Sequence, residues 1–195
     1  GEHQFGIKGE LICDKAFPSM PIYFWNDNNN ERYNNAYFDE FPNKWKHGDF
    51  IKINNEYGVK IYGRSDTTLN PGGIRIGTSE IYQALSDFKL IKDSLVVGKL
   101  KDNDEAIVLF IVLEDTLKLN NELIEKIKHR IKKYCSPKHV PSTIIPVKDI
   151  PYTINGKKVE IAVKNIINGL KINNKDSIVN PESLDYFKKI KDLHL

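Results

Sequence analysis

Cysteine is scarce in this sequence, and the scarcity argues against two kinds of structural reinforcement. The 195 residues contain only Cys13 and Cys135, which lie far apart, with no CxxC pair and no histidine at ligand spacing. Neither a structural zinc site nor a disulfide framework is indicated. We therefore expect no metal ligands in this chain and a reducing, cytoplasmic environment.

Long apolar runs are missing as well. The longest one, AIVLFIVL at residues 106–113, is far shorter than the roughly 20 residues that a membrane-spanning helix needs. The opening residues, GEHQFGIKGE, lack the charged-then-apolar layout of a signal peptide. These features predict a cytoplasmic protein with no membrane partner.

Arginine is rare, although the chain is rich in lysine. Lys and Arg together number 29, and the only arginines are Arg32, Arg64, Arg75 and Arg130. Two of the four lie in GRSDTTLNPGGIRIGTSEI, residues 63–81. A guanidinium group makes forked contacts with phosphate, carboxylate or vicinal hydroxyls that an ammonium group cannot make. This stretch is therefore a candidate binding region, with chance clustering as the alternative.

The overall balance is that of a globular protein, with 40% hydrophobic and 28% charged residues. The pattern from Gly9 to Gly63 indicates β-structure: a strand at residues 9–13 and a hairpin at 49–63 that turns around Asn54, Asn55 and Gly58. No helix is predicted in this part. The polar stretch at residues 24–35 is expected to be an exposed loop.

After Gly77 the pattern changes to alternating helices and strands. A helix begins where Thr78 or Ser79 could cap it. Further helices are predicted at 120–135, at 157–169 and from about Pro181, with buried strands at 94–100, 106–113 and 142–147. The predicted fold class is α+β: a small β-rich lobe, residues 1–65, followed by a compact α+β domain, residues 66–195.

Several side chains at the end of the lobe could carry chemistry. Asp49 begins the hairpin and could accept hydrogen bonds from both hydroxyls of a ribose, and the hairpin brings Arg64 back toward it. Asp66 follows the last strand, where hinges often lie. Gly72 and Gly73 leave the backbone bare enough for a ligand to approach closely. The plainer alternatives are a turn aspartate and an ordinary interdomain turn.

A second candidate lies in INGKKVE, where Asn155 and Gly156 shape a turn that projects Lys157 or Lys158 ahead of a helix. A lysine aimed at developing negative charge, where water is excluded, contributes roughly 3 kcal/mol of transition-state stabilisation. In a chain with so many lysines, a solvated surface group is the plainer interpretation. The sequence has no Ser-His-Asp arrangement, P-loop or GxGxxG motif, so no self-contained active site is visible.

Five segments occur in the order expected for one known family. They are GELICDKAFPSMPIYFWND, YFDEFPNKWKHGDF, GRSDTTLNPGGIRIGTSEIY, SPKHVP and NGK. Together they resemble the C-terminal portion of the adenylate-forming acyl-CoA synthetase superfamily, with the greatest similarity to its acetoacetyl-CoA synthetase branch. The resemblance covers nearly the whole chain. It implies that residues 1–65 are the end of a large N-terminal adenylation domain and that residues 66–195 are a mobile C-terminal domain with a tail.

The resemblance also implies an activity. The family joins a short 3-oxo acid to CoA: acetoacetate, ATP and CoA give acetoacetyl-CoA, AMP and pyrophosphate through an acyl-adenylate and a rotation of the C-terminal domain. Expected cofactors are ATP or AMP, CoA, and Mg²⁺ held mainly by ATP and the N-terminal domain. That domain is the expected protein partner, and no nucleic-acid partner is expected.

Matching positions carry the roles implied by the resemblance. Asp49 would hold the ribose hydroxyls, Arg64 would support the ribose, and Arg75 would sit near the phosphates. Asp66 would be the hinge, and Lys157 the catalytic residue that reaches the carboxylate and α-phosphate during adenylation. The remaining two, Gly72 and Gly73, would line the tunnel for the pantetheine arm of CoA. The loop before Lys157 departs from the family, which usually has arginine and serine where Tyr152, Ile154 and Asn155 stand.

Most of the N-terminal domain is missing from the 195 residues, so the chain alone is expected to be inactive. It could be an excised fragment, a split gene product or a decayed remnant. The alternative function is a non-catalytic interaction module that keeps the ligase fold. Nucleic-acid binding through the basic helix at 122–134 is disfavoured because Glu122 and Glu125 interrupt the positive charge and no aromatic residues are interleaved.

Overall fold

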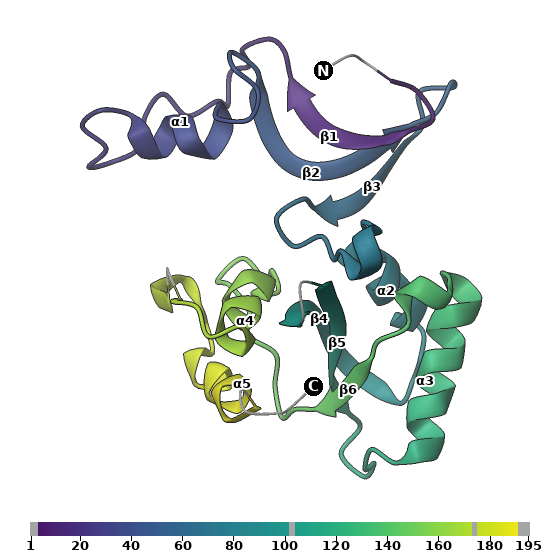
Figure 1. Ribbon diagram of the computed structural model, residues 1–195. Coiled ribbons are helices and arrows are strands. Elements are labelled where there is room, and N and C mark those ends of the chain that lie inside the picture. Colours follow the sequence, from purple (N-terminus) through teal and green to yellow (C-terminus); the bar gives the residue numbers. More distant parts are fainter. Residues whose placement is uncertain (1–3, 102–103, 173–174, 191–195) are drawn as a thin grey trace. The chain divides into compact units, whose positions relative to one another are not determined.

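The computed structural model describes residues 4–101, 104–172 and 175–190, and it divides the chain into two compact units (Figure 1). Unit 1 is Gly1–Asp66 and unit 2 is Thr67–Leu195. Unit 1 is rich in β-structure and unit 2 mixes helices and strands. This composition confirms the predicted α+β class.

Unit 1 is built on a three-stranded antiparallel sheet in the order β1-β2-β3. Its elements are β1 (Lys8–Cys13), α1 (Glu31–Tyr37), β2 (Trp45–Ile53) and β3 (Val59–Arg64). The predicted strand and hairpin are therefore confirmed. At the hairpin turn, the side-chain oxygen of Asn54 accepts hydrogen bonds from the N–H groups of Glu56 and Gly58, which is the local bonding that favours asparagine in turns.

Helix α1 corrects the expectation that residues 24–35 form a loop and that this part has no helix. The carboxylate of Asp27 accepts hydrogen bonds from the backbone N–H of Arg32 and of Tyr33, at 3.1 and 2.9 Å. These bonds satisfy donors that the first turn of a helix leaves free. Tyr37 then stacks on Trp45 of β2, with 3.6 Å between the ring centroids. Tertiary packing outweighs the weak helix propensity of an asparagine-rich segment.

Unit 2 contains a second three-stranded sheet in the order β4-β5-β6, in which β4 and β5 are antiparallel and β5 and β6 are parallel. Its elements are α2 (Thr78–Leu85), β4 (Ile91–Lys101), β5 (Asp104–Leu113), α3 (Asn121–Tyr134), β6 (Thr143–Pro146), α4 (Glu160–Ile167) and α5 (Leu184–Ile190). Short 3₁₀ turns lie at Pro71–Gly73, Pro137–His139, Lys175–Ser177 and Pro181–Ser183. The predicted strands and helices of this part are confirmed.

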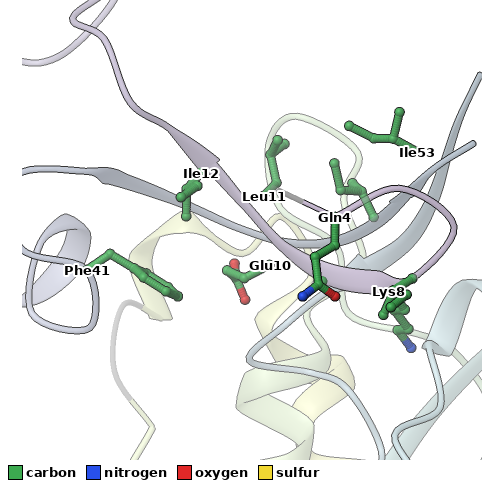
Figure 2. A pocket seen from close by; sticks show the side chains of 10 residues that line it. Gln4, Lys8, Glu10, Leu11, Ile12, Phe41 and Ile53 are labelled. Carbon is green, nitrogen blue, oxygen red and sulfur yellow. The ribbon is translucent and has the colours of Figure 1, made fainter. Parts of the chain in front are cut away.

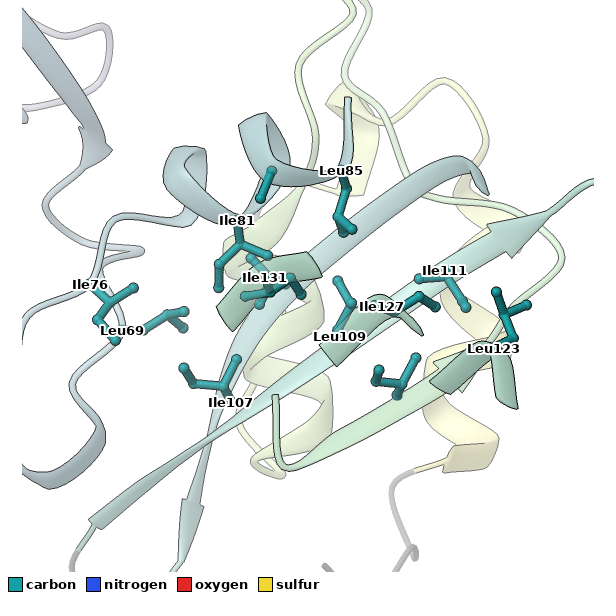
Figure 3. Packing of buried hydrophobic residues seen from close by; sticks show 13 residues of the cluster. Leu69, Ile76, Ile81, Leu85, Ile107, Leu109, Ile111, Leu123, Ile127 and Ile131 are labelled. Atoms are coloured by element: carbon teal, nitrogen blue, oxygen red, sulfur yellow. The ribbon is translucent and has the colours of Figure 1, made fainter. Parts of the chain in front are cut away.

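Helices cover both faces of this sheet, which explains the unbroken apolar run of β5. Alternate residues of the run enter two different cores. Leu109 and Ile111 pack with α2 and α3 (Figure 3), whereas Val108 and Phe110 pack with α4 and α5. No helix among the described residues is long and apolar enough to cross a membrane.

Two helix starts differ from the sequence prediction. The N-cap of α2 is Gly77 rather than Thr78 or Ser79, and the Glu80 carboxylate accepts a hydrogen bond from the Gly77 N–H at 3.3 Å. Thr78 is instead the first, buried residue of the helix. Helix α4 begins at Glu160 instead of residue 157 because the preceding residues form a small hairpin, described below.

Candidate functional site

The structure places two of the expected site residues of unit 1 opposite each other. Asp49 of β2 and Arg64 of β3 are direct partners in the antiparallel register, as the hairpin predicted. The Asp49 side chain is 19% exposed, and its Oδ2 lies 2.5 Å from Nδ1 of His47. A carboxylate held at the sheet surface in this way keeps its second oxygen available as an acceptor for a ligand hydroxyl.

Arg64 is oriented by three hydrogen bonds to two neighbours. Its Nε and Nη2 donate to the two oxygens of Asp66 at 3.2 and 3.0 Å, and Nη1 donates to the carbonyl of His47 at 3.2 Å. The hydrogen bonds to Asp66 raise the pKa of the Arg64 guanidinium. A forked pair of this kind fixes the plane of the guanidinium as well as its position. Asp66, the expected hinge and the last residue of unit 1, is therefore hydrogen-bonded to Arg64, the residue expected to support the ribose.

Gly48 provides the space that Arg64 occupies. The φ angle of Gly48 is +86°, and a Cβ built on it would lie 2.9 Å from a guanidinium nitrogen of Arg64. A side chain at position 48 would therefore meet both a strained backbone and a filled space. The glycine therefore serves the placement of Arg64.

In unit 2, Gly72 and Gly73 lie in a loop closed by Leu69 and Ile76, whose backbone groups exchange hydrogen bonds of 2.9 and 2.8 Å. Both glycines have positive φ, +57° and +77°, and they form a 3₁₀ turn with Pro71. The carboxylate of Asp104 accepts a hydrogen bond from the Gly72 N–H at 2.7 Å. No atom of the described residues beyond its chain neighbours lies within 4 Å of a Cβ built on Gly73, so there is room for a ligand on that side of the loop.

Arg75 follows these glycines in the same loop, and its side chain is exposed. In the chain, Arg75 lies between the glycine turn and Ile76, which pairs with Leu69. The structure thus gathers Gly72, Gly73 and Arg75 on one loop of unit 2.

Lys157 lies at a hairpin tip. Thr153 and Lys157 close the tip: the Thr153 N–H donates to the Lys157 carbonyl at 2.8 Å, and the Lys157 N–H donates to Thr153 Oγ1 at 3.1 Å. Gly156, with φ +70°, makes the turn. The Lys157 side chain is exposed, and its ammonium has no hydrogen-bond or ion-pair partner among the described residues. It can therefore extend toward a ligand.

Lys158, the next residue, is held in place. Its ammonium donates to Oδ1 of Asp93 at 2.7 Å and to the carbonyl of Ser94, and it lies 4.5 Å from the centroid of the Tyr82 ring. The sequence left open which of the two lysines is projected. In the structure, the Lys157 ammonium has no partner among the described residues, whereas Lys158 is bound and anchors the hairpin.

The hairpin and the glycine loop are anchored at opposite ends of β4 and β5. Lys158 bonds to Asp93 and Ser94 near the start of β4, whereas Gly72 bonds to Asp104, whose ladder partner is Lys101 at the end of β4. The seven steps of extended strand from Ser94 to Lys101 span roughly 23 Å. Unit 2 therefore presents two separate ligand-facing features, one at each end of this ladder.

A buried polar network links α2, α4 and β4, and sequence analysis did not identify it. The Tyr82 hydroxyl donates to the Glu160 carboxylate and accepts from the Val96 N–H at 3.1 Å. Glu160 also accepts hydrogen bonds from the hydroxyls of Thr67 and Thr78. The pKa of Glu160 is raised above its ordinary value because the group is buried, although these hydrogen bonds oppose the rise. A lone glutamate at a helix start gives no sequence signal of such partners.

A hollow of unit 1 lies elsewhere, against β1 and β2 (Figure 2). It has a volume of about 260 Å³ and is lined mostly by apolar side chains, together with Gln4, Lys8 and Glu10. Burial raises the pKa of Glu10. None of the expected site residues lines this hollow. Among the described residues, no cluster of three or more His, Cys, Asp or Glu side chains could hold a metal ion.

One known protein family matches part of this chain. The family described as AMP-binding enzyme C-terminal domain matches residues 80–157. That range begins in α2 and ends at Lys157. It contains the whole of the sheet of unit 2 and the hairpin as far as Lys157.

Similar proteins match over nearly the full chain. The chain is 47% identical over 188 residues, 96% of its length, to "Acetoacetyl-coenzyme A synthetase" of Rhizobium meliloti (strain 1021). It is 47% identical over 195 residues to "Acetoacetyl-CoA synthetase" of Xenopus tropicalis. In each case the chain spans 29% of the length of the relative.

A solved structure agrees with these relatives. "Acetoacetyl-CoA Synthetase from Streptomyces lividans" superposes with a TM-score of 0.90 at 36% identity, over 98% of this chain and 29% of that chain. The benzoate CoA ligase of Burkholderia xenovorans LB400, at 22% identity and a TM-score of 0.67, shares the fold.

Proposed function

The chain is homologous over nearly its whole length to the C-terminal part of acetoacetyl-CoA synthetases, and from that premise we propose that it supplies the C-terminal part of an ATP-dependent acetoacetate–CoA ligase. In the first step a carboxylate oxygen of acetoacetate attacks the α-phosphorus of ATP and releases pyrophosphate. In the second step the CoA thiolate attacks the acyl carbon of the adenylate, and AMP leaves.

The position of Lys157 is the observation that carries the proposal. A flexible ammonium at a hairpin tip, with no partner among the described residues, would reach the substrate carboxylate and the α-phosphate, where negative charge accumulates during adenylation. Lys158 cannot do so without breaking its contacts to Asp93 and Ser94. The chain therefore offers one lysine for chemistry and uses the next to hold it.

Unit 1 offers a ribose contact in this proposal. Asp49 would accept hydrogen bonds from the vicinal hydroxyls of the nucleotide, with Arg64 beside it in the register. The fork between Arg64 and Asp66 would connect nucleotide binding to the residue at the boundary of the two units. Asp66 would serve as the hinge of the domain rotation.

The glycine loop would serve the second step. Gly72 and Gly73 leave room for the thin pantetheine arm of CoA, and Arg75 supplies positive charge for a phosphate of a ligand. Because the hairpin and the glycine loop lie at opposite ends of the β4–β5 ladder, one rotating domain could present them in turn. Mg²⁺ would arrive with ATP, since the described residues offer no cluster that could hold it.

A chimera tests the proposal. The chain would replace the corresponding segment of the Rhizobium meliloti acetoacetyl-CoA synthetase, and acetoacetate-dependent ATP–pyrophosphate exchange would be measured. We expect exchange from the chimera and none from the purified 195-residue chain. A folded chimera without exchange would support the alternative, a non-catalytic module that keeps the fold. Exchange by the chain alone would contradict the proposal that the chain needs the N-terminal domain for adenylation.

Replacing the free lysine tests its role within the chimera. Lys157→Ala should lower adenylation by at least about 100-fold, because it removes the donor aimed at the developing charge. Thioester formation from preformed acetoacetyl-adenylate should stay within about twofold. Lys148→Ala, at another exposed lysine of unit 2, is the matched control and should leave both steps unchanged. Equal loss of both steps in Lys157→Ala would contradict the assigned role.

A further inference from the structure

The hairpin that carries Lys157 is closed by a pair of residues whose side chains meet a single carboxylate. Tyr152 and Lys158 form an antiparallel bridge at its base, and the Thr153–Lys157 hydrogen bonds lie inside that bridge. The Tyr152 hydroxyl donates to Oδ2 of Asp93 at 2.6 Å, and the Lys158 ammonium donates to Oδ1 of Asp93 at 2.7 Å. Asp93 therefore holds both arms of the hairpin at once.

Asp93 is itself well fixed. It lies in β4 at an irregularity in the ladder, where the register shifts between Ile91 and Asp93. Its Oδ1 also accepts a hydrogen bond from the N–H of Ser94 at 2.7 Å. Its side chain is 24% exposed and that of Lys158 is 25% exposed, so water competes little for the contact. Charge-assisted hydrogen bonds in partly buried surroundings are stronger than those at an open surface.

We propose that Asp93 is a positioning residue: it clamps the hairpin at Tyr152 and Lys158 and so fixes the place from which Lys157 reaches. The structural part stands on these contacts alone, while the catalytic consequence rests on the proposed function. Displacing a catalytic group by about 1 Å can cost roughly 100-fold in rate. The first arm of the hairpin is also hydrogen-bonded to residues 177–179, through the Tyr152 carbonyl and the Ile154 N–H. The second arm, which carries Lys157, follows the flexible Gly156 and depends on Asp93 through Lys158.

The clamp also explains why the Lys158 ammonium stays against β4, whereas most surface lysines extend into water. Without Asp93, the Lys158 ammonium would keep, among the described residues, the Ser94 carbonyl, the face of Tyr82 and the more distant charge of Glu160. A partly buried charge left short of partners would tend to move toward water. Because Lys158 adjoins Lys157 in the chain, that movement would carry the catalytic tip with it.

The first test measures the order of the loop in the 195-residue chain itself. Asp93→Asn keeps the side-chain volume but removes the charge and leaves an acceptor for only one of the two arms. Amide hydrogen exchange followed by NMR should become at least about tenfold faster at Thr153, Gly156 and Lys157, with less than twofold change at Val163 of α4. Unchanged exchange at those three amides would overturn the proposal, as would equal loss of protection along α4.

Two further variants make this test specific. Tyr152→Phe removes only the hydroxyl that reaches Asp93, so exchange at the same amides should rise by about threefold, and this milder change guards against global misfolding. Asp115→Asn removes an ion pair of 2.7 Å with Lys92, the neighbour of Asp93 in β4, and should leave the hairpin amides unchanged. Faster hairpin exchange in Asp115→Asn would show a general effect of charge loss and overturn the clamp.

The second test asks for the catalytic consequence in the chimera. Asp93→Asn should lower acetoacetate-dependent adenylation by about 100-fold while thioester formation from preformed acetoacetyl-adenylate stays within about twofold. A folded wild-type chimera without activity would overturn the proposed function, and the exchange measurement would still decide the clamp. An active chimera in which Asp93→Asn keeps full adenylation would overturn the positioning role and leave the proposed function intact.

Discussion

Gly48 shows how one absent side chain can determine the placement of another residue. Its positive φ alone would favour glycine, and the guanidinium of Arg64 occupies the space that a Cβ would need. Arg64 cannot move aside freely, because Asp66 and the His47 carbonyl hold it. Position 48 therefore affects the expected ribose contact and the expected hinge through a single neighbour.

Gly48→Ala should destabilise unit 1 by about 1–2 kcal/mol, of which about 1 kcal/mol is backbone strain at positive φ. Gly6→Ala is the matched control: Gly6 has φ +76° but nothing within 4 Å of its built Cβ, so it should show the strain alone. Urea unfolding followed by tryptophan fluorescence measures both variants. In an Arg64→Ala background, Gly48→Ala should cost no more than Gly6→Ala, and an undiminished cost there would contradict the packing argument.

The choice between Lys157 and Lys158 also belongs to the scale of single residues, and it marks a limit of sequence analysis. Two adjacent lysines are chemically identical in the sequence. Their different roles depend on Asp93, which lies 65 positions before Lys158 in the chain. Asn155 and Gly156 located the turn in the sequence, but only a long-range contact distinguishes the lysine that anchors from the lysine that reaches.

Elements that repeat a regular pattern were predictable. The alternation in residues 49–63 predicted the hairpin and the approach of Arg64 to Asp49, because antiparallel pairing follows from a short turn. The fully apolar run at 106–113 predicted a buried strand, which β5 confirms. Helix α1 was not predictable in the same way, since its start depends on Asp27, outside the helix, and on packing of Tyr37 against Trp45.

The contact between α2 and α4 makes unit 2 sensitive to alkali. Burial, followed by the nearby charge of Glu160, raises the pKa of Tyr82 well above its ordinary value of 10.0. The folded state thus keeps this phenol neutral at pH values where the unfolded chain would ionise it. Its contribution to stability is present below pH 10 and is lost as the pH rises through the folded pKa.

Urea unfolding followed by far-UV circular dichroism, between pH 8 and 11, tests this contact. Above pH 10 the free energy of unfolding should fall by up to about 1.4 kcal/mol per pH unit on account of Tyr82. Tyr82→Phe should be less stable at pH 8, because Glu160 and the Val96 N–H lose a partner, but its stability should decline less steeply above pH 10. Equal slopes for wild type and variant would contradict the assignment.

At the scale of the whole molecule, the two units differ in how much apolar surface they bury by themselves. Among the described residues of unit 1, the buried apolar ones are Trp45, Phe50 and Ile51, whereas unit 2 has two extensive clusters on the two faces of its sheet. Unit 1 also exposes large apolar side chains, among them Ile22 at 86% and Trp25 at 80%. Since burial of apolar surface is the main stabilising contribution to folding, the stability of the chain should reside mostly in unit 2.

Unit 1 should therefore unfold at a lower urea concentration than unit 2. Both tryptophans, Trp25 and Trp45, lie in unit 1, so fluorescence follows that unit alone. Helices α2 to α5 all lie in unit 2, so circular dichroism at 222 nm follows mainly that unit. The fluorescence midpoint should come first, and a chain of residues 67–195 should keep the dichroism midpoint of the full chain. Coincident transitions for the two probes would mean that the units fold as one cooperative body, and the separate behaviour that a domain rotation requires would then have no support in this chain.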